Sequence, residues 1–226
     1  MKVRWYGQSA FLVSGGQRVA IDPFWKMSEV AATRGMKFDY PEIDGLQADL
    51  LLVTHEHRDH NGVEAVAGSP ATIRSTAGKL DSPVGEVVAV ASEHDRAAGT
   101  ERGPNTIFRF TLDGLRVCHL GDFGQEALRP AQVEAIGEVD LLFIPVGDGV
   151  TVGGESAAAV VRALRPRLAV PMHYRTEALD FLDPPDSFLA ALGAPVERLE
   201  TSEFDVEPLL GTHDAVRVVM PRTPLR

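Results

Sequence analysis

The 226-residue sequence predicts an α/β (α+β) fold in which helices lie outside β-sheets. Two observations support this prediction. Strand-like and helix-like segments are interspersed along the whole chain, and the run 140–146 is apolar throughout, as in a strand that is buried on both faces. The chain also has no repeat, no low-complexity segment and no linker rich in Pro or Ser. We therefore expect residues 1–226 to form one domain.

The first half of the chain is expected to contain mainly strands. Turns at Gly7 and Gly15-Gly16 separate short apolar segments near the N-terminus. A helical turn or two is expected over 63–67, and Asp113-Gly114 has the composition of a hairpin turn. The expected strands of this half are 2–6, 10–13, 18–21, 50–53, 72–73, 87–91, 106–110 and 116–120.

Helices and strands alternate in the second half. Good helix formers fill 156–164 and stop before Pro166, which cannot continue a helix. The other expected helices are 127–136 and 187–192, and the expected strands are 140–146, 168–170, 196–199, 203–206 and 215–219.

The segment 23–48 is rich in aromatic and polar residues and has little periodicity. Long irregular segments between strands are often functional loops. The alternative is a loop whose aromatic side chains simply pack on the core, and the sequence does not decide between the two.

Composition narrows the functional classes. The formal net charge is −10, which argues against broad binding to a nucleic-acid backbone. Cys118 is the only cysteine, so an intrachain disulfide and a Cys-rich metal site are excluded. No apolar run approaches the roughly 20 residues of a membrane span, and the N-terminus lacks the apolar core of a signal peptide. We expect a cytoplasmic protein that does not bind membranes.

Six consecutive residues carry the strongest chemical signal, His55-Glu56-His57-Arg58-Asp59-His60, and they directly follow a predicted buried strand. Imidazole nitrogen and carboxylate oxygen are ligands that divalent metals accept. Side chains alternate in an extended segment, so His55 and His57 point the same way. A turn after them would bring Asp59 and His60 to the same pocket, and this pattern predicts a site for two metals rather than one.

A metal-type ligand follows the end of five predicted strands. Sites in α/β sheets collect at the carboxyl ends of strands, so these side chains could converge on one pocket. The five residues are Asp22, His55, His94, Asp122 and His173.

Together these segments resemble the metallo-β-lactamase fold, and within it the ascorbate-6-phosphate-lactonase-like group of metal-dependent hydrolases. The H-x-H-x-D-H signature is highly specific for the fold, whereas the segments 21–24 and 171–174 point to the subgroup. Segments 6–11, 121–123 and 151–157 extend the resemblance over nearly the whole chain. The resemblance implies an αββα four-layer sandwich with metals in a cleft at the sheet edges.

The resemblance also implies two divalent metal ions and their ligands. The expected ligands are His55, His57 and His94 for the first metal, Asp59, His60 and His173 for the second, and Asp122 as the bridge. Asp59 and Asp122 are the expected catalytic carboxylates, and Asp22 would orient a ligand imidazole from behind. The alternatives are a surface role for His94 and an ordinary turn role for Asp22 before Pro23.

The expected activity is hydrolysis by a metal-bound hydroxide at this binuclear site. Two metals about 3.5–4 Å apart lower the pKa of bound water and stabilise the developing oxyanion. Zn is the expected metal, while Mn, Fe or Ni also suit a set of N and O ligands. We expect a lactonase-like or esterase-like enzyme that acts on a small ester, lactone or phosphorylated metabolite. A phosphodiesterase or nuclease of the same fold is the alternative enzyme, and a non-catalytic metal-binding module is the alternative without turnover.

Candidate substrate contacts are chosen because they neighbour the ligands. Tyr174 and Arg175 directly follow a ligand, and Arg175 could clamp a carboxylate or phosphate, while Phe24 and Trp25 could form one wall. The expected partner is a small-molecule substrate rather than nucleic acid, and a homo-oligomer is compatible with the sequence. Gln8 stands where the family often carries His, which puts proton transfer at that place in doubt.

Overall fold

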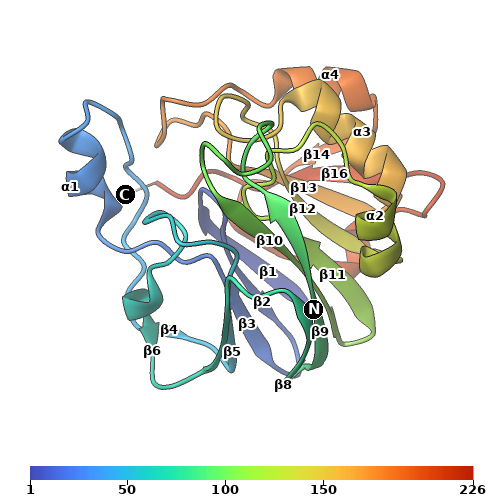
Figure 1. Ribbon diagram of the computed structural model, residues 1–226, viewed down its shortest axis with the longest axis horizontal. Coiled ribbons are helices and arrows are strands. Elements are labelled where there is room, and N and C mark those ends of the chain that lie inside the picture. The colour runs from blue at the N-terminus through green and yellow to red at the C-terminus, as the bar shows by residue number, and fades with distance from the viewer. Residues whose placement is uncertain (226) are drawn as a thin grey trace.

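Two large sheets and four helices make up the computed structural model, which describes residues 1–225 (Figure 1). Arg226, the last residue of the predicted domain, lies outside the described residues. Three helices, α2, α3 and α4, lie together on the side of β12 and β13, whereas α1 lies apart from them on the other side of the molecule (Figure 1). This layered arrangement is the α/β fold that the sequence predicts.

The first sheet contains six strands in the order β15-β1-β2-β3-β5-β7. Strands β1, β2 and β3 form an antiparallel meander, whereas β3, β5 and β7 run parallel to one another. The parallel strands place their carboxyl ends at one edge of the sheet. The bounds are β1 Lys2–Gly7, β2 Ala10–Ser14, β3 Arg18–Ile21, β5 Leu50–Val53, β7 Ala71–Arg74 and β15 Glu203–Asp205.

The second sheet contains eight strands in the order β14-β16-β13-β12-β11-β10-β9-β8. Strands β9 and β11 both run antiparallel to β10, and β11, β12 and β13 are parallel, so β9, β11 and β13 end at the same edge. The bounds are β8 Gly78–Ser82, β9 Gly85–Glu93, β10 Pro104–Leu112, β11 Leu115–His119, β12 Leu141–Pro145, β13 Leu168–Met172, β14 Val196–Arg198 and β16 Arg217–Met220.

The remaining elements are short. Leu46–Gln47 (β4) pairs with Val66–Ala67 (β6), so the predicted helical turn over 63–67 is a 3-10 turn, Val63–Ala65, followed by this strand. The helices are α1 Met27–Ala32, α2 Pro130–Ile136, α3 Gly154–Leu164 and α4 Asp186–Leu192, and a second 3-10 turn is Glu207–Leu209. Within residues 1–225, no helix is both long and apolar enough to cross a membrane.

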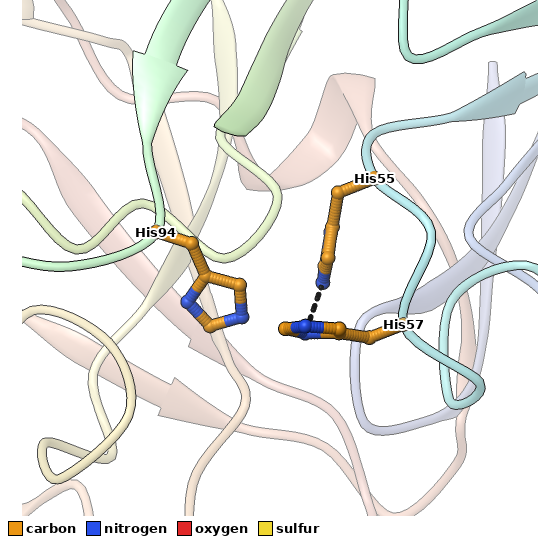
Figure 2. Close-up of side chains that lie close together, drawn as sticks. All are labelled: His55, His57 and His94. Atoms are coloured by element: carbon orange, nitrogen blue, oxygen red, sulfur yellow. Dashed lines mark hydrogen bonds between the residues drawn. The ribbon is translucent and has the colours of Figure 1, made fainter. Parts of the chain in front are cut away.

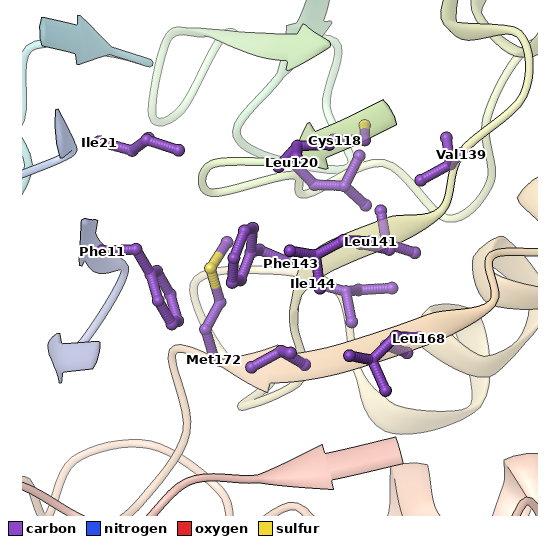
Figure 3. Close-up of a cluster of buried hydrophobic side chains, with 14 of the residues drawn as sticks. Phe11, Ile21, Cys118, Leu120, Val139, Leu141, Phe143, Ile144, Leu168 and Met172 are labelled. Carbon is purple, nitrogen blue, oxygen red and sulfur yellow. The ribbon is translucent and has the colours of Figure 1, made fainter. Parts of the chain in front are cut away.

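Aromatic and branched side chains from both sheets fill the space between them (Figure 3). Phe11 of the first sheet packs on Phe143 of the second, with ring centroids 4.3 Å apart. Cys118 is fully buried in this core, as expected for a small apolar side chain in the middle of a strand. The core fixes the two sheets relative to each other, and with them the strand ends that carry the candidate site.

The segment 23–48 covers the outer face of the first sheet. Phe24, Phe38 and Tyr40 are buried and pack edge to face, with centroids 4.9 Å apart for the first pair and 5.2 Å for the second. The packing alternative is therefore correct for these aromatic residues. The same segment also forms α1, which the sequence analysis did not predict, and α1 lines the cavity described below.

Candidate metal centre

Five strand ends from the two sheets converge at one place. Asp22 follows β3 and His55 follows β5 of the first sheet. His94, Asp122 and His173 follow β9, β11 and β13 of the second sheet. All five side chains are buried, which is unusual for ionisable groups and indicates a shared role.

The first group of candidate ligands is His55, His57 and His94, whose ring nitrogens lie within 4.8 Å of one another. Figure 2 shows the three rings pointing into a common space, two from the loop after β5 and one from the end of β9. His55 Nε2 and His57 Nδ1 are 3.1 Å apart. Three nitrogens at this spacing can hold one divalent ion.

The second group is Asp59, His60 and His173, whose ligand atoms also lie within 4.8 Å of one another. A turn brings the first two residues back toward the cluster, because the main-chain N–H of His60 donates to the His57 carbonyl oxygen at 2.9 Å. The third residue comes from the other sheet, as in the first group.

The carboxylate of Asp122 lies between the two groups. Its Oδ2 atom is 3.1 Å from His94 Nε2, 3.1 Å from His173 Nε2 and 3.2 Å from His60 Nε2. One oxygen of Asp122 therefore lies within 3.2 Å of a nitrogen from each group.

Asn105 and Gly121 hold Asp122 in this position. Asn105 Oδ1 accepts the Asp122 main-chain N–H at 3.0 Å, and Asn105 Nδ2 donates to the Leu120 carbonyl oxygen at 2.8 Å. Gly121 has φ +57°, and a Cβ atom there would lie 2.3 Å from Asn105 Oδ1. The sequence analysis missed Asn105 because it lies in β10, far from every motif in the chain.

Asp22 orients two of the histidines. Its carboxylate accepts the Nδ1–H of His60 at 2.9 Å, the main-chain N–H of Thr54 at 2.8 Å and the Thr54 hydroxyl at 2.6 Å. The Thr54 hydroxyl oxygen also lies 3.0 Å from His55 Nδ1 and can accept its proton. Both imidazoles thus have Nδ1 held by a neighbouring group and Nε2 turned to the cluster, which is the orientation that a ligand needs.

The pKa values of His55 and His60 are shifted in opposite directions. Burial and the neighbouring His60 together lower the pKa of His55 to about 3, so this ring stays neutral near pH 7. Burial by itself would lower the pKa of His60, but Asp122 and Asp59 outweigh burial and hold that pKa well above the usual range. Burial would likewise raise the pKa of Asp122, but His173 and His60 hold it well below the usual range.

Several buried polar atoms of the cluster lack hydrogen-bond partners in the described part of the chain. They are His60 Nε2, His94 Nδ1, Asp122 Oδ1 and His173 Nδ1. Each such atom costs about 1–3 kcal/mol unless something else satisfies it. A divalent cation would satisfy the atoms that face the cluster, and the donor set of imidazole and carboxylate suits one.

Gln8 extends the cluster at the end of β1. Its Nε2–H donates to Asp59 Oδ2 at 2.9 Å, and the residue has a left-handed φ of 52°. The Gln8 carbonyl oxygen accepts the indole N–H of Trp5 at 3.1 Å, which helps to hold this conformation. The neutral amide of Gln8 therefore orients the Asp59 carboxylate.

A cavity of about 370 Å³ opens onto the cluster, and it is lined by His57, Asp59, His94, Asp122 and His173. The four residues that we expected as substrate contacts do not line it. Phe24 is buried against Phe38 and Tyr40, and Trp25 lies beside a separate surface hollow. Tyr174 stacks on Trp5 at 5.8 Å, and Arg175 Nε donates to the Leu182 carbonyl oxygen at 2.7 Å. Tyr174 and Arg175, which directly follow His173 in the chain, line a different surface hollow.

Two other ionisable residues near the cluster have partners outside it. His119 is fully buried, and its Nε2–H donates to the Ser9 carbonyl oxygen at 3.0 Å, so it is a packed core histidine rather than a candidate ligand. Glu56 turns away from the cluster and binds Arg74 and Ser75.

Comparison with known proteins supports the fold described above. A family model described as a Beta-lactamase superfamily domain matches residues 2–173. The chain is 32% identical to a UPF0173 metal-dependent hydrolase of Thermococcus onnurineus, over 78% of this chain and 85% of that protein. It is 29% identical to one of Pelotomaculum thermopropionicum, over 90% and 98%. A crystal structure of a metallo-β-lactamase superfamily protein from Thermotoga maritima matches with a TM-score of 0.75 and 31% identity, covering 97% of each chain. The predicted fold is thereby confirmed.

Proposed function

The chain belongs to the β-lactamase superfamily and is a metal-dependent hydrolase, and from this premise we propose that it cleaves a small ester or lactone at a binuclear centre. One observation carries the proposal. Asp122 Oδ2 lies within 3.2 Å of a nitrogen from each of two groups of ligand atoms, and all of these residues are positioned by strand ends or by the loop after β5.

The two groups would hold one ion each. We propose His55, His57 and His94 for the first ion and Asp59, His60 and His173 for the second, with Asp122 shared between them. Zinc is the metal that we propose, because the donors suit it and because the name of the Thermotoga maritima protein includes zinc.

Other residues of the site would orient the metal ligands and hold the substrate. Bound ions of this kind supply an activated water molecule and polarise the bond to be cleaved. Asp22 and Thr54 keep two imidazoles in the orientation that binds metal, and Gln8 fixes the orientation of Asp59. The cavity seats the substrate beside Asp122.

The cavity and the charge of the chain favour a small substrate over a nucleic acid. A volume of about 370 Å³ falls in the range of about 300–1,000 Å³ that holds small molecules, and its walls include several apolar side chains. A net charge of −10 disfavours long phosphate backbones. We propose a lactonase-like or esterase-like activity, as in the ascorbate-6-phosphate-lactonase-like subgroup. We also propose that residues 1–226 act as one domain, because both sheets contribute to one core.

The test is a comparison of turnover on lactone, ester and phosphodiester panels, with protein that has been stripped of metal and reloaded with zinc. Metal content is measured on the same samples by elemental analysis. Asp122→Asn is the test variant. Asp49→Asn is the matched control, because Asp49 binds Arg18 outside the cavity.

We expect two zinc ions per chain and turnover of lactones or esters, both of which depend on Asp122. The control should match the natural protein in metal content and rate. Turnover of phosphodiesters alone would refute the substrate class. One ion per chain, or full turnover by Asp122→Asn, would refute the binuclear centre.

A further inference from the structure

The cavity beside the candidate metal centre has an apolar part and a cationic part. Apart from the candidate ligands, its lining residues are Met27, Ala31, Met36, Phe38, Val150 and Phe181, together with Arg34 and Arg102. Phe181 is 38% exposed and is one of few large apolar side chains on the described surface, so this part of the cavity is accessible. An apolar body of a substrate could pack there.

Arg34 and Arg102 have unpaired guanidinium groups. Neither side chain makes an ion pair or a hydrogen bond with any residue that the structure describes. Eight other arginines do form ion pairs with carboxylates. Other described arginines, such as Arg58 and Arg198, also lack a side-chain partner, but they line other surface hollows. Arg34 and Arg102 differ from them because they line the cavity beside the candidate metal centre.

The main chain of both arginines is nevertheless held in place. The Arg34 N–H donates to the Ala31 carbonyl oxygen at 2.9 Å, at the end of α1. The Arg102 N–H donates to Asp95 Oδ2 at 2.8 Å, and Asp95 directly follows the candidate ligand His94. The cavity therefore carries two available guanidinium groups on anchored segments.

Building on the proposed hydrolase function, we propose that the substrate carries an anionic group at the end of an apolar body, and that Arg34 and Arg102 bind this group. A guanidinium presents two parallel N–H donors that match the oxygens of a carboxylate or a phosphate. The apolar lining would pack on the rest of the substrate, and the bond to be cleaved would lie at the metal centre. The two arginines are thus residues that determine specificity.

The test compares two 4-nitrophenyl esters of the same length. One is the octanoate ester, and the other is the mono-ester of octanedioate, which ends in a carboxylate instead of a methyl group. A third ester of the same body that ends in a phosphate distinguishes the two kinds of anion. The proteins are the zinc-loaded natural chain, Arg34→Ala, Arg102→Ala, the double variant and the two lysine variants. Arg198→Ala is the matched control, because Arg198 is exposed and lines a different hollow.

We expect the natural chain to prefer an anionic ester by about tenfold to one-hundredfold in kcat/KM, the size of a charge-assisted contact. Each alanine variant should lose most of that preference through a higher KM for the anionic ester, while the octanoate ester is unaffected. Lysine should restore part of the preference. An equal rate on neutral and anionic esters, or a preference that survives in the double variant, would overturn the proposal.

A binding measurement separates this proposal from the hydrolase proposal. Calorimetric titration with octanedioate and with octanoate requires no turnover. If no ester is cleaved but octanedioate binds more tightly in a manner that depends on both arginines, the anion site stands and the ester hydrolase fails. If both esters are cleaved at equal rates and the two acids bind equally, the hydrolase stands and the anion site fails.

Discussion

Replacement of Asp22 by alanine should weaken both folding and metal binding. The Asp22 carboxylate is fully buried and accepts three hydrogen bonds, two from Thr54 and one from His60 Nδ1. The variant would leave these three donors without an acceptor. It would also free His60 to rotate or to change its tautomer.

The expected loss of stability can be worked from these contacts. An unsatisfied buried donor costs about 1–3 kcal/mol, and removal of one partner from a buried charged pair costs about 3–5 kcal/mol. Part of the cost is offset because a buried carboxylate no longer has to be desolvated. We therefore expect the free energy of unfolding to fall by about 3–5 kcal/mol. Loss of an outer carboxylate should also weaken zinc affinity by about 10–100-fold.

The assay combines urea unfolding, followed by circular dichroism, with zinc affinity from chelator competition. Asp49→Ala is the control, since Asp49 also accepts a main-chain N–H, that of Arg18, but lies away from the centre. Asp22→Asn should lie between the natural chain and Asp22→Ala in both measurements, because its amide oxygen retains one acceptor whereas its amide NH2 group cannot accept a hydrogen bond. An unfolding free energy within about 1 kcal/mol of the natural chain, with unchanged zinc affinity, would refute the reasoning.

Three further predictions concern Gln8, His60 and the core. Gln8→Ala removes the donor 2.9 Å from Asp59 Oδ2, so zinc affinity should fall about tenfold while the fold is retained. An unchanged zinc affinity in chelator competition would contradict this prediction. Asp122 and Asp59 raise the pKa of His60 above its usual range despite burial. In the metal-free protein, protonated His60 therefore stabilises the folded state fully below its unfolded pKa near 6.5, and this stabilisation is lost as pH rises through the folded pKa. Zinc must displace that proton, and calorimetry in two buffers of different ionisation enthalpy should detect its release at pH 7.5; equal heats would count against it. Phe143→Ala should lower the free energy of unfolding by about 3–5 kcal/mol with kcat unchanged at low temperature, and a loss below about 1 kcal/mol would show that the core collapses around the gap.

The candidate ligands could be predicted from the sequence where metal-binding residue types follow an apolar strand. His55 to His60 stand at the end of a continuously apolar strand, and this context predicts that the candidate ligands lie at one edge of the sheet. Gly78–Ser82 was missed as a strand, because β8 pairs with only one neighbour and has mostly exposed side chains without the apolar alternation of a half-buried strand.

The walls of the cavity could not be predicted from the sequence. They come from α1, from Val150 and from Phe181, three places far apart in the chain that share no period or motif. Arg34 and Arg102 look like any surface arginine in the sequence. Only the three-dimensional arrangement shows that they lack partners and line the same cavity as Asp122.

The division of the ligands between the sheets has a consequence for protein engineering. Except for β15, the first sheet is built from residues before Ser75, and the second sheet is built entirely from residues after it. A cut in the connection at residues 75–77 would place His55 to His60 on one fragment and His94, Asp122 and His173 on the other. In the proposed binuclear zinc centre, each ion would coordinate both fragments at once. Reassembly of the cut chain should then depend on zinc concentration, and the pair of fragments would serve as a zinc-controlled switch.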